Sequence, residues 1–311
     1  MSYPSYTRRD FLIRAAGLLA AAGAPSLALG KENGGERMAD EKSDIIKLPA
    51  SFYQQFDADH KLDVPGEGYG GWKKAEIEIS RDHTAVVVMH AWDQGTRERY
   101  PGWYRAVEYI LRANEISRKV LPGLLSAVRK SGMKLFHVAS GDGYARKYPG
   151  YKRAVELAGP EPPELEQIKA DPLLERLHKF RSEHVFVGKH NGEDVRHGFE
   201  NVDFAPDAKP LDDEGIAETG HQLFALCNDA GINHLIYAGF AINWCLLLSP
   251  GGMADMSRRG LMCSALRQAT TAVENKESAR AELHKEEGLW RVSLAYGFVF
   301  DVEDFVKGIG C

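Results

Sequence analysis

The sequence is poor in the residue pairs that build zinc sites and disulfide frameworks. Only four of its 311 residues are cysteines, and none lies three positions before another cysteine or a histidine. A zinc site or a disulfide-rich fold would need such spacings. We therefore expect neither, and we expect no cofactor and no metal. The cysteines are Cys227, Cys245, Cys263 and Cys311.

The sequence also lacks an excess of positive charge. Lysine and arginine number 39 against 44 aspartates and glutamates, so the formal net charge is −5. Proteins that bind nucleic acid usually carry a basic patch, which this balance does not supply, and we do not expect nucleic acid as a partner. Internal repeats are absent as well. The length and the 44% hydrophobic content suffice for one large domain with extensions, or for two small ones.

The N-terminal apolar run falls short of the ~20 residues that a membrane-spanning helix needs. This run, residues 15–29, is rich in alanine and contains Pro25. It follows residues 7–12 (TRRDFL), which match a twin-arginine export signal. A short membrane anchor or a chance arginine pair is the alternative. We expect residues 1–30 to be a cleaved signal peptide, the twin-arginine translocation machinery to be a partner, and the protein to be periplasmic or extracytoplasmic.

Residues 31–78 show no regular pattern. The charged residues 31–47 are typical of a flexible linker. The glycine-rich run at residues 65–71 interrupts any regular element in the aromatic stretch that follows the linker. We expect a linker and an N-terminal arm that packs on the main domain, and we place that domain at residues 79–311.

Strands that alternate with helices fill the main domain. The continuous apolar run at Thr84–Met89 is typical of a strand that is covered on both faces of a parallel sheet. The alternation predicts an α/β fold with three layers, in which a parallel, roughly six-stranded sheet lies between two layers of helices. The other predicted strands are at residues 134–139, 184–188, 234–240, 261–266 and 297–300.

Chemically active residues follow three of the predicted strands. His90 and Lys189 come directly after two of them, and Cys245 opens the helix after residues 234–240. Because the carboxyl ends of parallel strands share one edge of the sheet, these side chains can meet there. A helix N-terminus favours the thiolate, the nucleophilic form of cysteine. Most free cysteines, however, are buried small hydrophobes.

Five short motifs in this order cover nearly the whole domain. They are AVVVMH at 85–90, VGKH at 187–190, AGFAINWC at 238–245, RG at 259–260 and ATTA at 269–272. Together they resemble the isochorismatase-like cysteine hydrolases, which include nicotinamidases and N-carbamoylsarcosine amidase. The resemblance implies an isochorismatase-like fold, a small-molecule substrate and hydrolysis of an amide-type C–N bond. It also allows a homo-oligomer.

The resemblance assigns roles to individual residues. It implies that Cys245 is the nucleophile, that Lys189 lies beside it, and that the peptide bond between Phe240 and Ala241 is cis. The backbone N–H groups of Ala241 and Cys245 would form the oxyanion hole. This chemistry is consistent, since the thiolate attacks a carbonyl, the N–H groups hold the oxyanion, and water releases the acyl group.

His90 occupies the position at which the family has an aspartate. A histidine can take the proton of a cysteine thiol, and together with Lys189 it leads us to expect a low pKa for Cys245. Residues 142–144 (DGY) lack the histidine of the nicotinamidase metal motif, so nicotinamide is not an expected substrate. We expect the substrate pocket to include Trp92, Asp93 and Trp244.

Two functions remain open on the sequence. The first is an exported hydrolase that forms a thioester at Cys245. The second is a catalytically idle descendant that binds a small molecule or a partner in the same pocket. The second stays open because His90 replaces the aspartate of the family.

Overall fold

The computed structural model describes residues 44–140, 143–163 and 165–310. The expected signal peptide at residues 1–30, most of the expected linker and Cys311 lie outside these ranges. Within the described residues, no helix is both long enough and apolar enough to cross a membrane.

One large sheet forms the centre of the described residues, with strands in the order β2-β1-β10-β9-β8-β3-β5-β7. The six strands from β10 to β7 run parallel, and β1 and β2 form an antiparallel hairpin at one end. The predicted parallel, roughly six-stranded sheet is thus confirmed, with the hairpin added to it. The strands are β1 (Ile45–Gln54), β2 (Gly71–Ser80), β3 (Thr84–Met89), β5 (Lys134–Val138), β7 (Gly215–Ala217), β8 (His234–Gly239), β9 (Met262–Thr270) and β10 (Val299–Phe300), and a separate short pair consists of β4 (Trp92–Asp93) and β6 (Asp203–Phe204).

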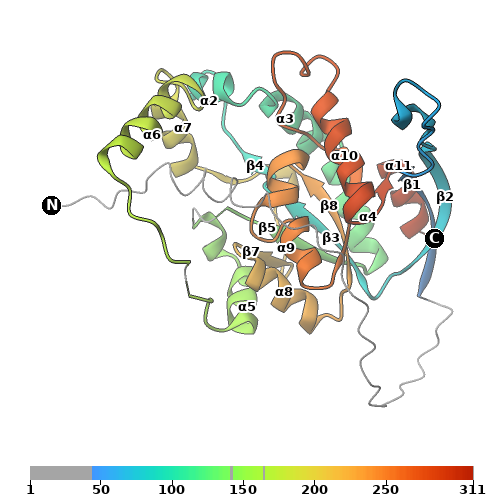
Figure 1. The fold of residues 1–311 in the computed structure, drawn as a ribbon. Helices are drawn as coiled ribbons and strands as arrows, with labels where there is room; N and C mark the ends of the chain where they lie inside the picture. Colours follow the sequence, from blue (N-terminus) through green and yellow to red (C-terminus); the bar gives the residue numbers. More distant parts are fainter. Residues whose placement is uncertain (1–43, 141–142, 164, 311) are drawn as a thin grey trace.

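Helices cover both faces of the sheet, which confirms the three predicted layers (Figure 1). Because side chains alternate along a strand, Val86 and Val88 face α3, α4 and α11, whereas Val87 and Met89 face α5, α8, α9 and α10. The helices are α2 (Pro101–Ala106), α3 (Ile110–Lys119), α4 (Leu121–Ser131), α5 (Pro149–Ala158), α6 (Pro172–His184), α7 (Gly192–Glu200), α8 (Gly220–Asp229), α9 (Met253–Arg258), α10 (Leu283–Ala295) and α11 (Val302–Ile309).

The strand predicted at residues 184–188 does not form. His184 is the last residue of α6, and the residues after it form a loop. A strand needs a free neighbouring edge, and the outer edge of β5 is occupied by β7. Ile216 belongs to β7, and α8 begins at Gly220, where the side chain of Thr219 caps it.

Residues 45–80, of which residues 45–78 were expected to belong to a linker and an arm, form the β1–β2 hairpin. Ten residue pairs join the two strands, from Ile45 opposite Ser80 to Gln54 opposite Gly71. Leu48 is fully buried in the same core cluster as Phe305 of α11. The sheet therefore begins at Ile45, within the range expected to be a linker.

Candidate active site

The ends of five neighbouring parallel strands lie in one row. Thr270 of β9 is in register with Gly239 of β8, which is in register with Met89 of β3. Met89 is in register with Val138 of β5, and Val138 with Ala217 of β7. The first residues after these strands therefore share one edge of the sheet, where open α/β sheets bind ligands.

Backbone hydrogen bonds continue this row for one more residue. The N–H of His90 donates to the carbonyl of Val138 at 3.0 Å, and the N–H of Ala139 donates to that of Ala217 at 2.8 Å. His90 and Glu218 thus lie in the same row, two strands apart. At the usual strand spacing their backbones are roughly 10 Å apart, which suits a small molecule that spans the edge.

Gly239 allows the end of β8 to approach the end of β3. Its φ is +120°, and a Cβ at this position would lie 1.9 Å from the carbonyl oxygen of Met89. Only glycine avoids that overlap. The peptide bond between Phe240 and Ala241 is cis, which is the conformation that the resemblance implied.

Cys245 lies in a helical turn, η4 (Ile242–Leu246), that follows β8. Burial raises the pKa of its thiol, and hydrogen bonds from the Ser249 hydroxyl and the Ala241 backbone N–H lower it in part. The low pKa expected from the sequence is therefore wrong for the free protein, because desolvation of the thiolate outweighs the donors around it. The Ala241 contact does place a backbone donor beside the sulfur.

Tyr109, directly before α3, lies near Cys245 and was not predicted. Burial is the main reason that the pKa of its phenol is raised, and negative charge on Cys245 and Glu108 raises it further. The phenol therefore stays protonated and can donate a hydrogen bond at this site. Tyr109 comes from a helix rather than a strand end, so the strand-end argument could not find it.

His90 is held in an unusual environment. Its φ is +55°, a left-handed conformation that costs a non-glycine residue roughly 1–2 kcal/mol, and only 8% of it is exposed. Its ring stacks on Trp92, with centroids 4.8 Å apart and planes at 17°. Burial lowers the pKa of His90 to about 4. The imidazole is consequently neutral at physiological pH and can accept a proton.

Three buried polar atoms at the row have no hydrogen-bond partner in the part of the chain that the structure describes. They are Nδ1 of His90, Oε1 of Glu218 and Oγ1 of Thr271. These residues are the first ones after β3, β7 and β9. An unpaired buried polar group costs about 1–3 kcal/mol. Three such groups along one edge indicate that this edge is arranged to meet a ligand.

Glu218 is the second residue that the sequence analysis missed. Its other carboxylate oxygen, Oε2, accepts a hydrogen bond from the Tyr151 hydroxyl at 3.2 Å and lies 3.5 Å from Arg146. Only 9% of the residue is exposed. Because β7 has three residues, its sequence gives too short an apolar pattern to mark a strand end.

Lys189 does not occupy the predicted position at the end of a parallel strand. It lies in the loop between α6 and α7, its side chain is exposed, and its backbone N–H donates to the carbonyl of Glu183 at 3.2 Å. The reason for bringing Lys189 to the sheet edge was the strand at residues 184–188, and that strand is absent from the described residues. This correction removes the support for Lys189 as a partner of Cys245.

The predicted pocket residues are divided between the site and the surface. Trp92 is buried against His90, and its indole N–H donates to the Tyr144 hydroxyl at 3.0 Å. Asp93 is exposed, and its carboxylate accepts the N–H of Gly95 at 2.9 Å, so it closes a turn. Trp244, beside Cys245 in the sequence, is 42% exposed. Trp92 therefore contacts a candidate catalytic side chain, that of His90.

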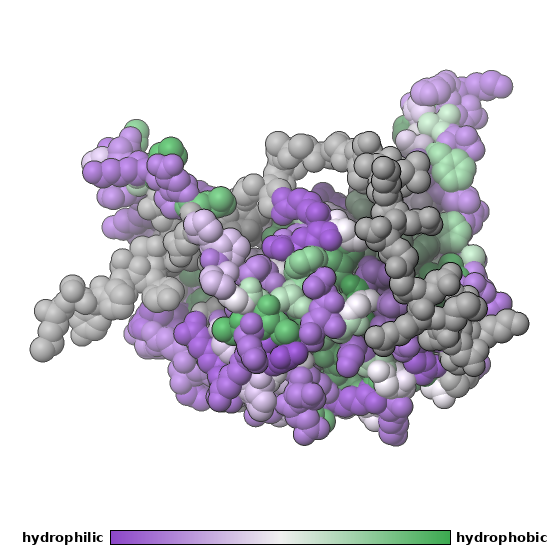
Figure 2. Space-filling model, turned by 90° about the horizontal axis from the view of Figure 1, so that it is seen from below, coloured by the Kyte–Doolittle hydropathy of each residue, from purple (hydrophilic) through white to green (hydrophobic). Residues whose placement is uncertain are grey.

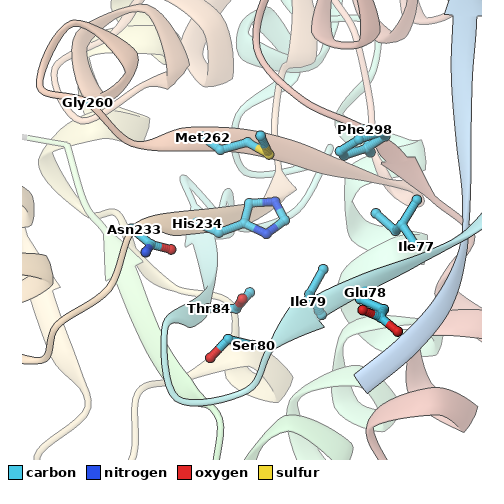
Figure 3. A pocket seen from close by; sticks show the side chains of 10 residues that line it. All are labelled: Ile77, Glu78, Ile79, Ser80, Thr84, Asn233, His234, Gly260, Met262 and Phe298. Atoms are coloured by element: carbon cyan, nitrogen blue, oxygen red, sulfur yellow. The ribbon is translucent and has the colours of Figure 1, made fainter. Parts of the chain in front are cut away.

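A separate hollow of about 490 Å³ lies at the opposite edge of the sheet (Figure 3). Thr84, His234 and Met262, the first residues of β3, β8 and β9, line it together with side chains of β2. The hollow therefore belongs to the amino ends of the strands and is distinct from the row at their carboxyl ends.

In the described residues, no group of three or more His, Cys, Asp or Glu side chains is placed to hold a metal ion.

No protein-family model and no curated protein matches this chain. Among solved structures, it is similar to a cysteine hydrolase from Pseudomonas syringae pv. phaseolicola 1448A, with a TM-score of 0.42, 14% identity, and coverage of 74% of this chain and 94% of that chain.

It is also similar to an isochorismatase family protein from Burkholderia thailandensis, with a TM-score of 0.43 and 12% identity. The match covers 74% of this chain and 97% of that chain. For a nicotinamidase from Staphylococcus aureus the TM-score is 0.35 and the identity 10%, with coverage of 70% and 98%. At these values the likeness assigns neither an activity nor a substrate to this chain, and its α/β fold rests on the sheet and helix layers described above.

Proposed function

We propose that this protein is a hydrolase of amide-type C–N bonds in small molecules, with Cys245 as the nucleophile and His90 as the base. The observation that carries this proposal is the row of strand ends. Its three unpaired buried polar atoms belong to the residues that directly follow β9, β3 and β7, and the nucleophile candidate follows β8, which lies between β9 and β3.

In the proposed reaction, the sulfur of Cys245 attacks the substrate carbonyl while His90 takes the thiol proton. The backbone N–H groups of Ala241 and Cys245 hold the developing oxyanion. The C–N bond then breaks, and the amine leaves with the proton from His90. Water attacks the resulting thioester, the acid leaves, and the thiol is restored.

The two pKa values set the resting state of this pair. The pKa of His90 is about 4, and that of Cys245 lies above the usual 9.0 of a thiol. Proton transfer from Cys245 to His90 in the empty site is therefore unfavourable, because burial disfavours the charged form of both groups. The resting pair is a neutral thiol and a neutral imidazole, and proton transfer must accompany attack on the bound substrate.

Glu218 supplies the proposed site with a substrate contact. Its unpaired Oε1 lies in the same row as His90, roughly 10 Å along the edge. A buried carboxylate oxygen stabilises a ligand that brings a hydrogen-bond donor or a positive charge to it. We therefore propose that the substrate carries such a group on the side remote from the carbonyl that Cys245 attacks.

The second candidate function is a catalytically idle protein that binds a small molecule at the same edge. The raised pKa of Cys245 favours it, because the thiolate is then disfavoured, and so does the exposed position of Lys189, because no strand brings this ammonium group to the sheet edge in the described residues. The two functions share the row of strand ends and differ in whether Cys245 is reactive.

Alkylation with iodoacetamide tests the proposal without knowledge of the substrate. Burial raises the pKa of Cys227 to about 12 and that of Cys263 further, whereas hydrogen bonds to Cys245 offset part of its desolvation. Cys227 and Cys263 are also buried, and Cys245 is partly exposed. Mass-spectrometric mapping at neutral pH should show Cys245 modified before Cys227 and Cys263. If Cys245 reacts no faster than the other two, it is a structural residue and the hydrolase proposal fails.

We also propose that the twin-arginine route exports the protein. Residues 1–30, fused to a reporter, should direct transport that depends on both arginines of the TRRDFL motif. Conversion of Arg8 and Arg9 to lysine should abolish this transport. Undiminished transport of the double variant would show that another route is used.

A further inference from the structure

The hydroxyl of Thr271 is the unpaired polar group of the strand-end row that has no role in the proposed reaction. His90 is the base, and Glu218 binds the remote end of the substrate. Thr271 is 1% exposed, and its Oγ1 has no hydrogen-bond partner in the described residues. A hydroxyl at the surface finds a partner in water, as polar groups can on the mostly hydrophilic face in Figure 2. The hydroxyl of Thr271 is enclosed, and its place in the row indicates a bound ligand as its partner.

Thr271 lies directly beside the turn that carries Cys245. The N–H of Ile242, the first residue of that turn, donates to the Thr271 carbonyl at 2.7 Å. The next residues are joined twice, since Nδ2 of Asn243 donates to the Val273 carbonyl and Oδ1 accepts the Val273 N–H, both at 2.9 Å. The chain after β9 therefore stays paired with the chain after β8, which holds Thr271 next to the turn of the nucleophile.

Side-chain alternation places Thr271 on the side of the sheet that α3 covers. Ala269 belongs to the core cluster on that side, and Ala272 belongs to the cluster on the opposite side. Because successive side chains of an extended chain point to opposite faces, Thr271 shares the side of Ala269. Tyr109, which lies near Cys245, belongs to the same cluster as Ala269. The hydroxyl of Thr271 and the phenol of Tyr109 are therefore on the same side of the sheet.

The strand order determines which part of the substrate Thr271 meets. β8, which the turn with Cys245 follows, lies between β9 and β3. His90 follows β3 and Thr271 follows β9, so these two residues lie on opposite sides of the β8 end, with backbones about 10 Å apart. In the proposed reaction the leaving amine takes its proton from His90 and therefore lies toward β3. The acyl side of the attacked carbonyl then lies toward β9 and Thr271.

A buried threonine hydroxyl selects a neutral polar group close to the attacked carbonyl. It can donate one hydrogen bond and accept others, so either a hydroxyl or a carbonyl of the ligand satisfies it. A methyl group would leave it unpaired, and a charged group would need an opposite charge to offset its desolvation. Neighbouring strands are about 5 Å apart. An oxygen on the carbon next to the attacked carbonyl, with a hydrogen bond of about 2.8 Å, spans that distance.

We propose that Thr271 determines the acyl specificity of the site, and that the substrate carries a hydroxyl or a carbonyl group on the carbon next to the carbonyl that Cys245 attacks. The substrate class is then a 2-hydroxy or 2-oxo amide. This inference rests on the proposed function, because it needs Cys245 as the nucleophile and His90 on the side of the leaving amine.

Aldehydes that bond reversibly to Cys245 test the proposal without knowledge of the substrate. The sulfur adds to the aldehyde carbon, the C=O double bond becomes a single bond, and the thiol proton moves to the oxygen. Glycolaldehyde and propanal differ in having a hydroxyl or a methyl group on the next carbon. Protection of Cys245 against iodoacetamide gives the dissociation constant of each, expressed per free aldehyde. The wild type should bind glycolaldehyde at least about tenfold more tightly than propanal.

Three variants show whether Thr271 is responsible for this preference. Thr271→Val replaces the hydroxyl with a methyl group of similar size and should bring the ratio of the two dissociation constants close to one. Thr271→Ser keeps a hydroxyl and should retain the preference. Thr270→Val is the matched control and should keep the wild-type ratio, because the Thr270 hydroxyl already donates to the Arg267 carbonyl at 3.2 Å and lies on the other side of the sheet.

The outcomes separate this inference from the proposed function. If iodoacetamide modifies Cys245 but the wild type binds both aldehydes equally, or Thr271→Val keeps the wild-type ratio, the role of Thr271 is refuted and the hydrolase proposal stands. Glyoxylate carries a carboxylate on the aldehyde carbon and should bind more weakly than glycolaldehyde. Tighter binding of glyoxylate would overturn the assignment of a neutral group. A Cys245 that iodoacetamide does not modify would overturn both proposals.

Discussion

At the scale of single residues, burial dominates the chemistry of the site. The imidazole of His90 is buried and the thiol of Cys245 is partly buried, and this desolvation disfavours the charged form of each. Their pKa values therefore move apart, upward for Cys245 and downward for His90. In the proposed reaction, proton transfer between these two neutral groups takes place only when substrate is bound. Nδ1 of His90 has no hydrogen-bond partner in the described residues and is free to bind one from the substrate.

Removal of the Lys189 side chain should have no effect on the nucleophile. Lys189 is exposed in the loop after α6, and no strand brings it to the row. We expect Lys189→Ala to change the rate of Cys245 alkylation at pH 8 by less than twofold. A tenfold slower rate in the folded variant would place the ammonium group next to the sulfur and reverse our correction.

The sequence was sufficient to predict His90 and Cys245 as strand-end residues, because each follows a long apolar run. Glu218 could not be found in this way, since the three residues of β7 gain their strand conformation from pairing with β5 rather than from their own pattern. The sign of the pKa shift of Cys245 was predicted wrongly. A helix N-terminus can be located in a sequence, whereas the depth of burial that outweighs it depends on the packed structure.

At the scale of elements, the β1–β2 hairpin is part of the folded core. Leu48 of β1 is fully buried, and the side chain fills the space above Gly308 of α11, where a Cβ would lie 2.0 Å from it. Leu48→Ala should therefore lower the free energy of unfolding by about 2–5 kcal/mol. Ile45→Ala in the same strand, at a position 49% exposed, should cost less than about 1 kcal/mol.

Urea unfolding of both variants provides the measurement. If Leu48→Ala is no more destabilising than Ile45→Ala, the hairpin at residues 45–80 is only loosely attached to the sheet. The sequence could not distinguish these cases, because the glycine-rich run at residues 65–71 obscured the hairpin. In the structure this run is part of the connection between the two strands.

At the scale of the whole molecule, buried histidines make stability depend on pH, and burial lowers the pKa of His137 as well as those of His90 and His234. Burial lowers the pKa of His90 and of His234 from the usual 6.5 to about 4. As pH falls below 6.5 the unfolded chain binds protons at these positions, and the folded protein does not until about pH 4. Their contribution to stability is therefore complete above pH 6.5 and is lost as pH falls toward 4.

Between pH 7 and pH 5, each histidine should remove about 2 kcal/mol from the free energy of unfolding. Urea unfolding at the two pH values measures the difference. Glutamine at position 234 can keep the hydrogen bond to Ser264 but does not titrate. The His234→Gln variant should therefore show about half of the loss of unfolding free energy that His90 and His234 together cause between pH 7 and pH 5 in the wild type. Equal stability of the wild type at pH 7 and pH 5 would show that these imidazoles are accessible to protons in the folded state.

The proposed function depends on contact between His90 and Cys245, and the pH dependence of Cys245 alkylation tests that contact most directly. The rate should be measured from pH 6 to 10 for the wild type, His90→Ala and His90→Asp. His234→Ala serves as the control, since it removes an equally buried histidine at the amino end of β8. If His90 is the base, His90→Ala should slow alkylation at pH 7 at least about tenfold, whereas His90→Asp should retain or raise the rate and His234→Ala should leave it unchanged. Overlapping profiles for the wild type and the two His90 variants would contradict the account and leave the binding protein as the better description.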